Sequence, residues 1–251
     1  MKITLLGNAG IYIEAEGKRI LVDGIYKAKG HPFSPLPPDV FWNMKRGVGR
    51  YAHADYLLFT HFHPDHYSEE DVIDYLRANA VKKVLLPSRN PQASRLISHM
   101  EREEVSFFIF EDRRCKNQPL PSEDFFVGAF QCRHLGKQYE AVSSLCCSIK
   151  LEKKTLLFTG DADYDKRCFE KGLGDISVDA VFVNPLFFNH RSGREILREV
   201  IRPAKVILYH LPFEKDDKMK FREIVQRDRA KYGEIFPNIA VLQDPQQSLS
   251  I

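Results

Sequence analysis

The first 110 residues alternate short apolar runs with longer amphipathic stretches. Residues 2–6, 10–15 and 18–23 are apolar runs of strand length. The Glu16-Gly17-Lys18 turn between the last two predicts a β-hairpin. The same reading predicts further strands at 56–59, 83–87 and 106–110, and helices at 68–79 and from Pro91 onward.

The second half of the chain begins with strands again. Polar residues 112–123 mark a seam between the halves, and no sequence repeat crosses it. We expect one compact body, so residues 1–251 are predicted to form a single domain. A loop is expected at 187–191, a capping box at Ser192, and a loose tail from Pro245. Strands are predicted at 125–134, 143–151, 154–159, 179–185, 205–209 and 238–242, and helices at 165–171, 192–201 and 216–231.

The composition argues against several classes of protein. The net charge of +3 and the pI of about 8.5 are only mildly basic, so a dedicated nucleic-acid binder is not expected. No apolar run approaches the length of a membrane span, so none is predicted. The five cysteines are odd in number and lack CxxC spacing. We therefore expect no disulfide framework and, as the simplest location, a reducing cytoplasm.

Three histidines and an aspartate gather where a predicted strand ends and a helix begins. His61 and His63 are two apart in an extended segment, so both side chains point the same way and can hold one metal ion. Pro64 ends the strand, so Asp65 and His66 turn elsewhere, towards a second metal. Imidazole and carboxylate without thiolate suit zinc, iron or manganese at a reactive site. The alternative is a fortuitous histidine-rich surface loop.

Other candidate residues stand directly after apolar strands. His134, Asp161 and His210 do so, as His61 does, and strands that end along one edge would bring them to one cleft. Asp23 also ends a strand, where it either caps the turn or takes part in the metal site. Two further residues follow the strand at 179–185. His190 either contacts the substrate as a proton donor or packs in its loop, and Asn184 is a weaker candidate.

This order of motifs resembles the metallo-β-lactamase fold superfamily. The resemblance covers residues 3 to 242 and rests on the HxHxDH signature at 61–66, a lone His134, Thr159-Gly160-Asp161 and a final His210. It implies the α/β class, a four-layer αββα sandwich and a binuclear metal centre. The implied ligands are His61, His63 and His134 for the first metal, Asp65, His66 and His210 for the second, and Asp161 for both. Asp23 is implied as an outer support of the histidine loop.

The resemblance also implies an activity. Oxygen-reducing di-iron members carry a glutamate where this chain has His63, so the hydrolytic branch is favoured, with the lactonase-like and phospholipase-D-like cytoplasmic enzymes most similar. We expect a metal-dependent hydrolase of a small phosphodiester or lactone, with Zn²⁺ first among two divalent ions and Mn²⁺ or Fe²⁺ as alternatives. A hydroxide bridging both metals would be the nucleophile, and Asp65 could also take a proton. The alternatives are a di-iron oxidoreductase and a non-catalytic binding protein.

Residues 25–50 are too long and too rich in proline for a routine connection. Aromatic residues such as Phe41 and Trp42 argue against disorder, so we expect an insert that forms a lid over the metal site. His31 and His53 have no partner at ligand spacing and are expected to be structural. A large nucleic-acid-binding cap would have no room, which favours a small-molecule substrate. Basic residues that could meet an anionic substrate, or simply face solvent, are Lys45, Arg46, Arg50, Arg191 and Arg194.

Overall fold

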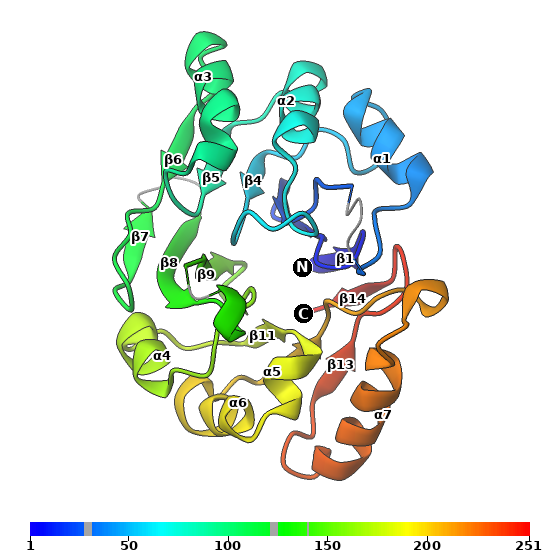
Figure 1. Cartoon of the computed structure of the whole chain (residues 1–251), viewed down its shortest axis with the longest axis vertical. Helices are drawn as coiled ribbons and strands as arrows, with labels where there is room; N and C mark the ends of the chain where they lie inside the picture. Colours follow the sequence, from blue (N-terminus) through cyan, green and yellow to red (C-terminus); the bar gives the residue numbers. More distant parts are fainter. Residues whose placement is uncertain (28–31, 121–124, 140) are drawn as a thin grey trace. The chain divides into compact units, whose positions relative to one another are not determined.

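A computed structural model describes residues 1–27, 32–120, 125–139 and 141–251. Contacts between residues divide the chain into two compact units. Figure 1 shows the chain coloured along its sequence. Unit 1 comprises Met1–Glu111 with Asp244–Ser250, and unit 2 comprises Asp112–Gln243 with Ile251. The boundary lies at the start of the polar seam predicted at 112–123. Each unit contains one seven-stranded sheet, and a single domain over 1–251 stays a prediction.

The sheet of unit 1 has the strand order β14-β1-β2-β3-β4-β5-β6. Its first four strands are antiparallel neighbours, and β3 to β6 pair in parallel. The strands are Lys2–Leu5 (β1), Ile11–Ala15 (β2), Lys18–Val22 (β3), Tyr56–Leu58 (β4), Lys83–Leu86 (β5), Phe107–Ile109 (β6) and Ser248–Ser250 (β14). The helices are Pro38–Lys45 (α1), Glu69–Ala78 (α2), the 3-10 turn Pro91–Ala93 and Ser94–Arg102 (α3).

The sheet of unit 2 has the strand order β13-β12-β11-β10-β9-β8-β7. Strands β7 to β10 are antiparallel neighbours, and β10 to β13 pair in parallel. The strands are Gln118–Leu120 (β7), Phe126–Arg133 (β8), Ser143–Leu151 (β9), Lys154–Phe158 (β10), Ala180–Val183 (β11), Lys205–Leu208 (β12) and Ile239–Val241 (β13). The helices are Lys166–Leu173 (α4), Pro185–Asn189 (α5), Arg191–Ile196 (α6), the π-helical turn Leu197–Ile201, Phe221–Tyr232 (α7), and the 3-10 turns Lys137–Tyr139 and Glu214–Asp216.

The two sheets share one pattern of strand directions, although the outer antiparallel strand is the C-terminal β14 in unit 1 and β7, which directly precedes β8, in unit 2. In each, an antiparallel half continues into a parallel half, and the central hairpin turns through two residues with positive φ. These are Glu16 and Gly17 in unit 1 and Glu152 and Lys153 in unit 2, and positive φ at both positions is the geometry of a type I′ turn. The repetition is therefore present in the backbone although no repeat crosses the seam in the sequence.

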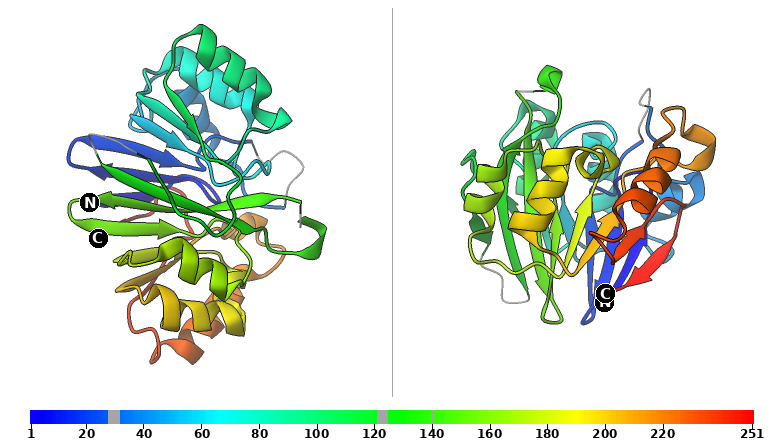
Figure 2. Two further views of the ribbon diagram at one scale, coloured as in Figure 1. Left: turned by 90° about the vertical axis from the view of Figure 1, so that its left-hand side faces the viewer. Right: turned by 90° about the horizontal axis from the view of Figure 1, so that it is seen from below.

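Helices cover a sheet face in each unit (Figure 2). In unit 1, the predicted apolar faces of α2 and α3 join the buried core, with Val72 on α2 and Leu96 on α3 fully buried. In unit 2, neighbouring parallel strands stack aromatic rings. The rings of Phe158 and Phe182 lie 4.3 Å apart at 13°, and Tyr209 meets Phe182 edge-on at 5.7 Å. The strand pattern thus supplies a continuous buried layer.

Two predictions near the end of β11 were wrong. A helix, α5, occupies much of the loop expected at 187–191 because Pro185 takes its first position and the Asn184 side chain accepts a hydrogen bond from Phe187 N at 2.8 Å. The next helix begins one residue earlier than the expected capping box. His190, rather than Ser192, caps α6, since its Nδ1 accepts from the Ser192 backbone N–H at 3.2 Å.

The tail and the insert also differ from expectation. The tail from Pro245 is not loose, because Ser248–Ser250 pairs antiparallel with β1 and the hydroxyls of Thr4 and Ser248 lie 2.9 Å apart. The segment 25–50 is not only a loop, since it contains α1. His31 lies outside the described residues. Whether the segment forms a lid stays a prediction.

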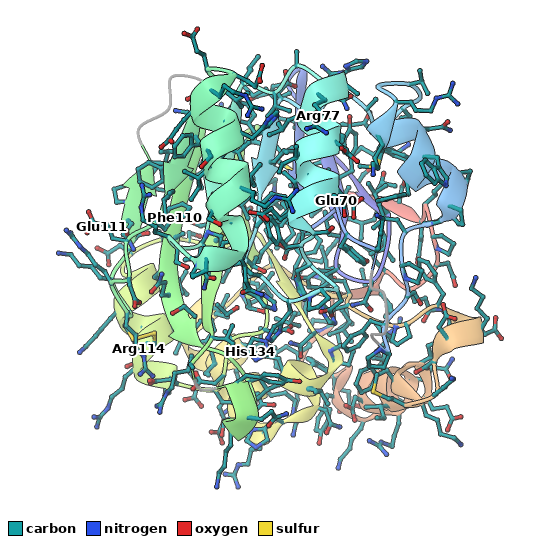
Figure 3. All side chains as sticks on the ribbon, turned by 45° about the horizontal axis from the view of Figure 1, so that its top comes forward. Glu70, Arg77, Phe110, Glu111, Arg114 and His134 are labelled. Carbon is teal, nitrogen blue, oxygen red and sulfur yellow. A yellow bond between two sulfur atoms is a disulfide. The ribbon has the colours of Figure 1, made fainter. Side chains whose placement is uncertain are left out.

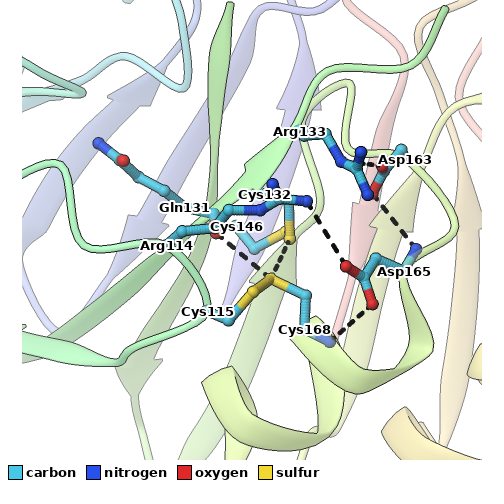
Figure 4. Close-up of a disulfide and its surroundings, with 9 residues drawn as sticks. All are labelled: Arg114, Cys115, Gln131, Cys132, Arg133, Cys146, Asp163, Asp165 and Cys168. Atoms are coloured by element: carbon cyan, nitrogen blue, oxygen red, sulfur yellow. Dashed lines mark hydrogen bonds and ion pairs between the residues drawn. A yellow bond between two sulfur atoms is a disulfide. The ribbon is translucent and has the colours of Figure 1, made fainter. Parts of the chain in front are cut away.

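The cysteines depart from the expectation of no disulfide. Cys115 and Cys168 form one within unit 2, between residues 53 positions apart (Figure 4). Sequence spacing could not indicate this pair, because one cysteine lies in the polar seam and the other in α4. Among the described residues, no helix is both long and apolar enough to cross a membrane.

Each unit contains an aspartate that binds the backbone of a neighbouring strand. Asp55 accepts a hydrogen bond from Arg19 N and Asp179 accepts one from Thr155 N, both at 2.8 Å. Because hydrogen bonds to charged groups are worth about 1.5–3 kcal/mol, Asp55→Ala and Asp179→Ala should each lower the free energy of unfolding by that amount. Urea denaturation measures this. Glu101→Ala, on the exposed face of α3, is the control and should change it by less than about 0.5 kcal/mol.

Candidate metal centre

The candidate residues of unit 1 follow strands that run in one direction. β1 and β3 are both antiparallel to β2, and β4 is parallel to β3, so the carboxyl ends of all three lie at one edge of the sheet. In α/β sheets this edge is where ligands bind. The residues that follow these ends are Asn8, Asp23 and the segment His61–His66.

Asp23 organises this edge. Its side chain is fully buried, and its backbone has a positive φ of 48° at the corner where the chain leaves β3. One carboxylate oxygen accepts from Thr60 N at 2.7 Å, and the other accepts from the Thr60 hydroxyl at 2.6 Å. The second oxygen also lies 3.0 Å from His66 Nδ1. This gives Asp23 the position that an outer support of the histidine loop requires.

The same contacts determine which ring nitrogens face outward. The Thr60 hydroxyl donates its only proton to Asp23, so the bond at 3.1 Å between its oxygen and His61 Nδ1 must use the proton of that nitrogen. His66 Nδ1 likewise donates to Asp23. Each neutral ring then carries a lone pair on Nε2, the form in which imidazole binds a metal.

The outward-facing atoms of unit 1 fit a cation. His61 Nε2 lies 3.1 Å from His63 Nδ1. Because Thr60 holds the proton on His61 Nδ1, the lone pair of His61 Nε2 points towards this second ring nitrogen. Imidazole nitrogens are donors that bind divalent cations. The backbone N–H of His66 donates to His63 O at 3.0 Å, which turns the chain after Pro64 as predicted. His66 Nε2 lies 3.6 Å from Asp65 Oδ2, so this pair forms a second set of donors.

Unit 2 presents its candidates at one edge of its own sheet. Strands β8, β10, β11 and β12 run in the same direction, because β9 is antiparallel to its two neighbours and β10 to β12 are parallel. His134 follows β8 (Figure 3). Asp161 follows β10, Asn184 follows β11 and His210 follows β12. The shared edge expected from strand-end positions is therefore present within this unit.

Asp161 lies between two imidazole rings. His134 Nε2 is 3.4 Å from one carboxylate oxygen, and His210 Nε2 is 3.8 Å from the other. His134 Nδ1 donates to the Leu135 carbonyl at 2.7 Å, which directs its Nε2 towards Asp161. Asn184 Nδ2 donates to Asp161 at 3.0 Å and so restrains the carboxylate. A carboxylate that offers each oxygen to a different histidine site is suited to bridging two ions.

The donor chemistry therefore fits divalent metal ions. The seven predicted ligands fall into two clusters of histidine and aspartate side chains that could each hold an ion, and the described residues contain no third cluster of this kind. Nitrogen and oxygen donors without sulfur favour Zn²⁺, Mn²⁺ or Fe²⁺. Which ligand serves which ion stays a prediction.

No protein-family model matches the sequence, and no curated protein matches it. Solved structures do resemble it. CmlA, a diiron β-hydroxylase from Streptomyces venezuelae, is 17% identical with a TM-score of 0.63 and matches 100% of this chain, which spans about half (54%) of CmlA. Igni18, a metallo hydrolase from Ignicoccus hospitalis, is 13% identical with a TM-score of 0.65 over 99% of this chain and 97% of its own. The metallo-β-lactamase fold protein YhfI from Bacillus subtilis is 11% identical with a TM-score of 0.60 over 99% of both chains.

The chain has the metallo-β-lactamase fold. The predicted fold class is thus confirmed, with two mixed seven-stranded sheets and flanking helices. At these identities the likeness establishes the fold alone. Within this fold, the structure adds supports that sequence reasoning missed. Thr60 and Ser144 are examples, because Ser144 Oγ accepts from Asp161 N at 3.1 Å. Only the adjacency of Thr60 to the histidine motif could have signalled such a role.

Two further candidate residues, His190 and Lys45, have partners close to them in their own unit. His190 is exposed, caps α6 and stacks on Tyr164 with ring centroids 4.0 Å apart. Its predicted catalytic role stays a prediction. Lys45 pairs with Asp71 at 2.9 Å and with Asp74 at 2.7 Å, so two carboxylates of its own unit already balance the positive charge of its ammonium group.

Asp23→Asn tests the support of His66. The amide keeps the size of the side chain but cannot accept the His66 proton with a negative charge, so metal affinity should fall by about 10–100-fold. Competition with a metal chelator measures the affinity. Asp55→Asn is the matched control, because Asp55 is also a buried aspartate beside a strand, directly before β4, but contacts Arg19 rather than the histidine loop. Equal affinities for the two variants would contradict the assigned role of Asp23.

Proposed function

We propose that this chain is a metal-dependent hydrolase whose histidine and aspartate donors hold two divalent cations. The proposal rests on the orientation of three histidine rings, each of which is fixed by a hydrogen bond from its Nδ1. In unit 1 the Nδ1 protons of His61 and His66 are bound by Thr60 and Asp23, and in unit 2 the Nδ1 proton of His134 is bound by Leu135. A buried polar network that only stabilised a fold would have no need to direct three Nε2 atoms in this way.

The proposed ligand assignment follows the sequence motif. Asp161 would bridge, because its two oxygens face His134 and His210 separately. When bound, two divalent cations supply an activated water at neutral pH and polarise a carbonyl or phosphoryl oxygen. The other ligands of the first ion would be His61, His63 and His134, and those of the second Asp65, His66 and His210.

The chain's own residues would then orient and move protons. Asp65 is almost fully buried, and Asn8 Nδ2 lies 3.5 Å from its Oδ2, which restrains the carboxylate. We infer that Asp65 accepts a proton from the attacking water. Asp23 would hold His66 in the tautomer whose Nε2 lone pair can bind a metal, since its carboxylate lies beside His66 Nδ1.

The proposed substrate is a small ester, either a phosphodiester or a lactone. The basic residues considered for an anionic substrate are partly engaged elsewhere. Lys45 is paired with aspartates, and Arg194 donates to Phe188 O at 2.8 Å and lies over the Tyr232 ring at 3.8 Å. Arg191 is more available, because its side chain is 87% exposed and pairs only locally with Glu195. This weakens the preference for an anionic substrate and leaves the lactone as an equal candidate.

A second candidate is oxygen chemistry at a di-iron centre. The likeness to CmlA supports it, since CmlA is a diiron β-hydroxylase of comparable TM-score. One observation favours hydrolysis. This chain carries His63 where oxygen-reducing di-iron members carry glutamate.

Metal analysis with activity assays tests the proposal. The purified chain, loaded in turn with zinc, manganese or iron, should bind two ions and hydrolyse a nitrophenyl phosphodiester or a chromogenic lactone. A chelator should abolish the activity. His134→Ala should lose about one ion and at least about 100-fold in kcat/KM, because a metal contributes several kcal/mol to transition-state stabilisation.

His53→Asn is the control for that variant. His53 is exposed with a φ of 57°, and asparagine tolerates this backbone, so metal content and rate should stay at the level of the unmodified chain. Full metal content in His134→Ala would overturn the ligand assignment. Two bound ions with no ester hydrolysis would favour a binding protein, and oxygen uptake by an iron-loaded chain would favour the di-iron oxidoreductase.

A further inference from the structure

Four of the five cysteines gather in unit 2, away from one another in the sequence (Figure 4). Cys115 precedes β7, Cys132 lies on β8, Cys146 on β9 and Cys168 in α4. The fifth, Cys147, follows Cys146 on the same strand, where successive side chains point to opposite faces. The fold therefore brings four of the five cysteine side chains together.

The sulfurs form a chain of short contacts. Cys115 and Cys168 are joined by the disulfide, and the Sγ of Cys132 lies only 3.3 Å from the Sγ of Cys168. Cys146 follows, with its Sγ 3.7 Å from that of Cys132. A free thiol in contact with a disulfide sulfur has the arrangement needed for thiol–disulfide exchange. Packing alone would place methyl-sized groups here equally well.

The accessibility of the four sulfurs is unequal. Cys132, Cys146 and Cys168 are buried, with at most 2% of each residue exposed, whereas Cys115 is partly exposed. Burial also raises the pKa of Cys146 well above its usual range, so this residue remains a thiol that can donate to Cys132. Only Cys115 is placed to meet a reagent from solvent.

We propose that these four residues form a thiol–disulfide exchange site, in which Cys132 displaces Cys115 from Cys168. The Cys132 sulfur attacks the Sγ of Cys168, the Cys132–Cys168 bond forms and the Cys115–Cys168 bond breaks. The proton of the Cys132 thiol passes to the Cys115 sulfur. One disulfide and one thiol are present before and after, so the step requires no oxidant or reductant.

The exchange releases a thiol at the surface. A backbone hydrogen bond and a neighbouring ion pair would keep Cys115 near the cluster, because Cys115 N donates to Gln131 O at 2.9 Å and the Arg114 side chain pairs with Asp165 at 3.5 Å. The step is therefore reversible. The freed Cys115 is the modification site, and the ligand class it accepts is a low-molecular-weight thiol reagent or disulfide. This inference does not depend on the proposed hydrolase activity.

Alkylation of the full chain under native, non-reducing conditions tests the exchange. N-ethylmaleimide is added to the oxidised protein, the reaction is stopped with acid, and the linked peptides are mapped by mass spectrometry. The expected product carries the label on Cys115 and a Cys132–Cys168 disulfide. In Cys132→Ser the labelling of Cys115 should be at least about tenfold slower, because no internal thiol contacts the disulfide. Cys147→Ser is the matched control and should label at the rate of the unmodified chain.

A second variant covers the case in which Cys132→Ser does not fold. Cys132→Ala removes the same thiol with an apolar side chain that suits the buried position, so it should slow the labelling of Cys115 by the same factor. Equal labelling of Cys115 in Cys132→Ala and in the unmodified chain would overturn the proposal. So would equal labelling of Cys115 in Cys132→Ser and the unmodified chain, labelling of Cys168 together with Cys115, or an intact mass without the loss of two hydrogens in the oxidised protein.

Discussion

The buried carboxylate of Asp23 is the interaction on which the histidine loop depends. It stands at the corner after β3 and accepts from both the backbone and the hydroxyl of Thr60, while facing the ring of His66. An unpaired charge at a fully buried position would cost several kcal/mol, so these partners are required for the corner to fold at all. Once they are in place, the directions of the His61 and His66 rings follow.

In unit 2 a backbone carbonyl orients one of the candidate histidines, as the Asp23 carboxylate does for His66 in unit 1. The Leu135 carbonyl orients His134, and Asn184 restrains Asp161 while also capping α5. Unit 1 therefore concentrates its candidate ligands in one segment held by one carboxylate, whereas unit 2 gathers them from three strand ends. The shared pattern of strand directions explains how both arrangements arise, because each sheet directs the carboxyl ends of its parallel strands to one edge.

The sequence predicted those features that depend on local pattern. Most strand positions, the hairpin at Glu16-Gly17-Lys18 and the strand-end placement of the ligands follow from alternation and turn residues, and the structure contains them. Features that depend on long-range pairing were not predictable in this way. Ser248–Ser250 is too short and polar to be recognised as a strand, and it exists because β1 offers an unpaired edge. The Cys115–Cys168 contact similarly depends on how α4 packs.

Local competition explains the other differences. His190 and Ser192 were both able to cap a helix, and the structure uses the histidine because α5 ends at Asn189 and leaves its ring beside the next free backbone N–H. A histidine committed to a cap and to a stack with Tyr164 has less freedom to serve a substrate. The sequence pattern could identify both candidate roles for His190, but only the fold shows that one of them is already filled.

Asp23 and His210 follow strands, belong to the candidate site and have a left-handed backbone conformation. Asp23 and His210 have φ values of 48° and 62°, a conformation that costs most side chains of order 1–3 kcal/mol. Glycine would relieve this cost but would remove a carboxylate that orients His66 in one case and a ring nitrogen facing Asp161 in the other. Aspartate and histidine are among the residues that tolerate the conformation best. The corners thus retain a donor at a modest cost in backbone energy, which is the balance expected where a fold carries a reactive site.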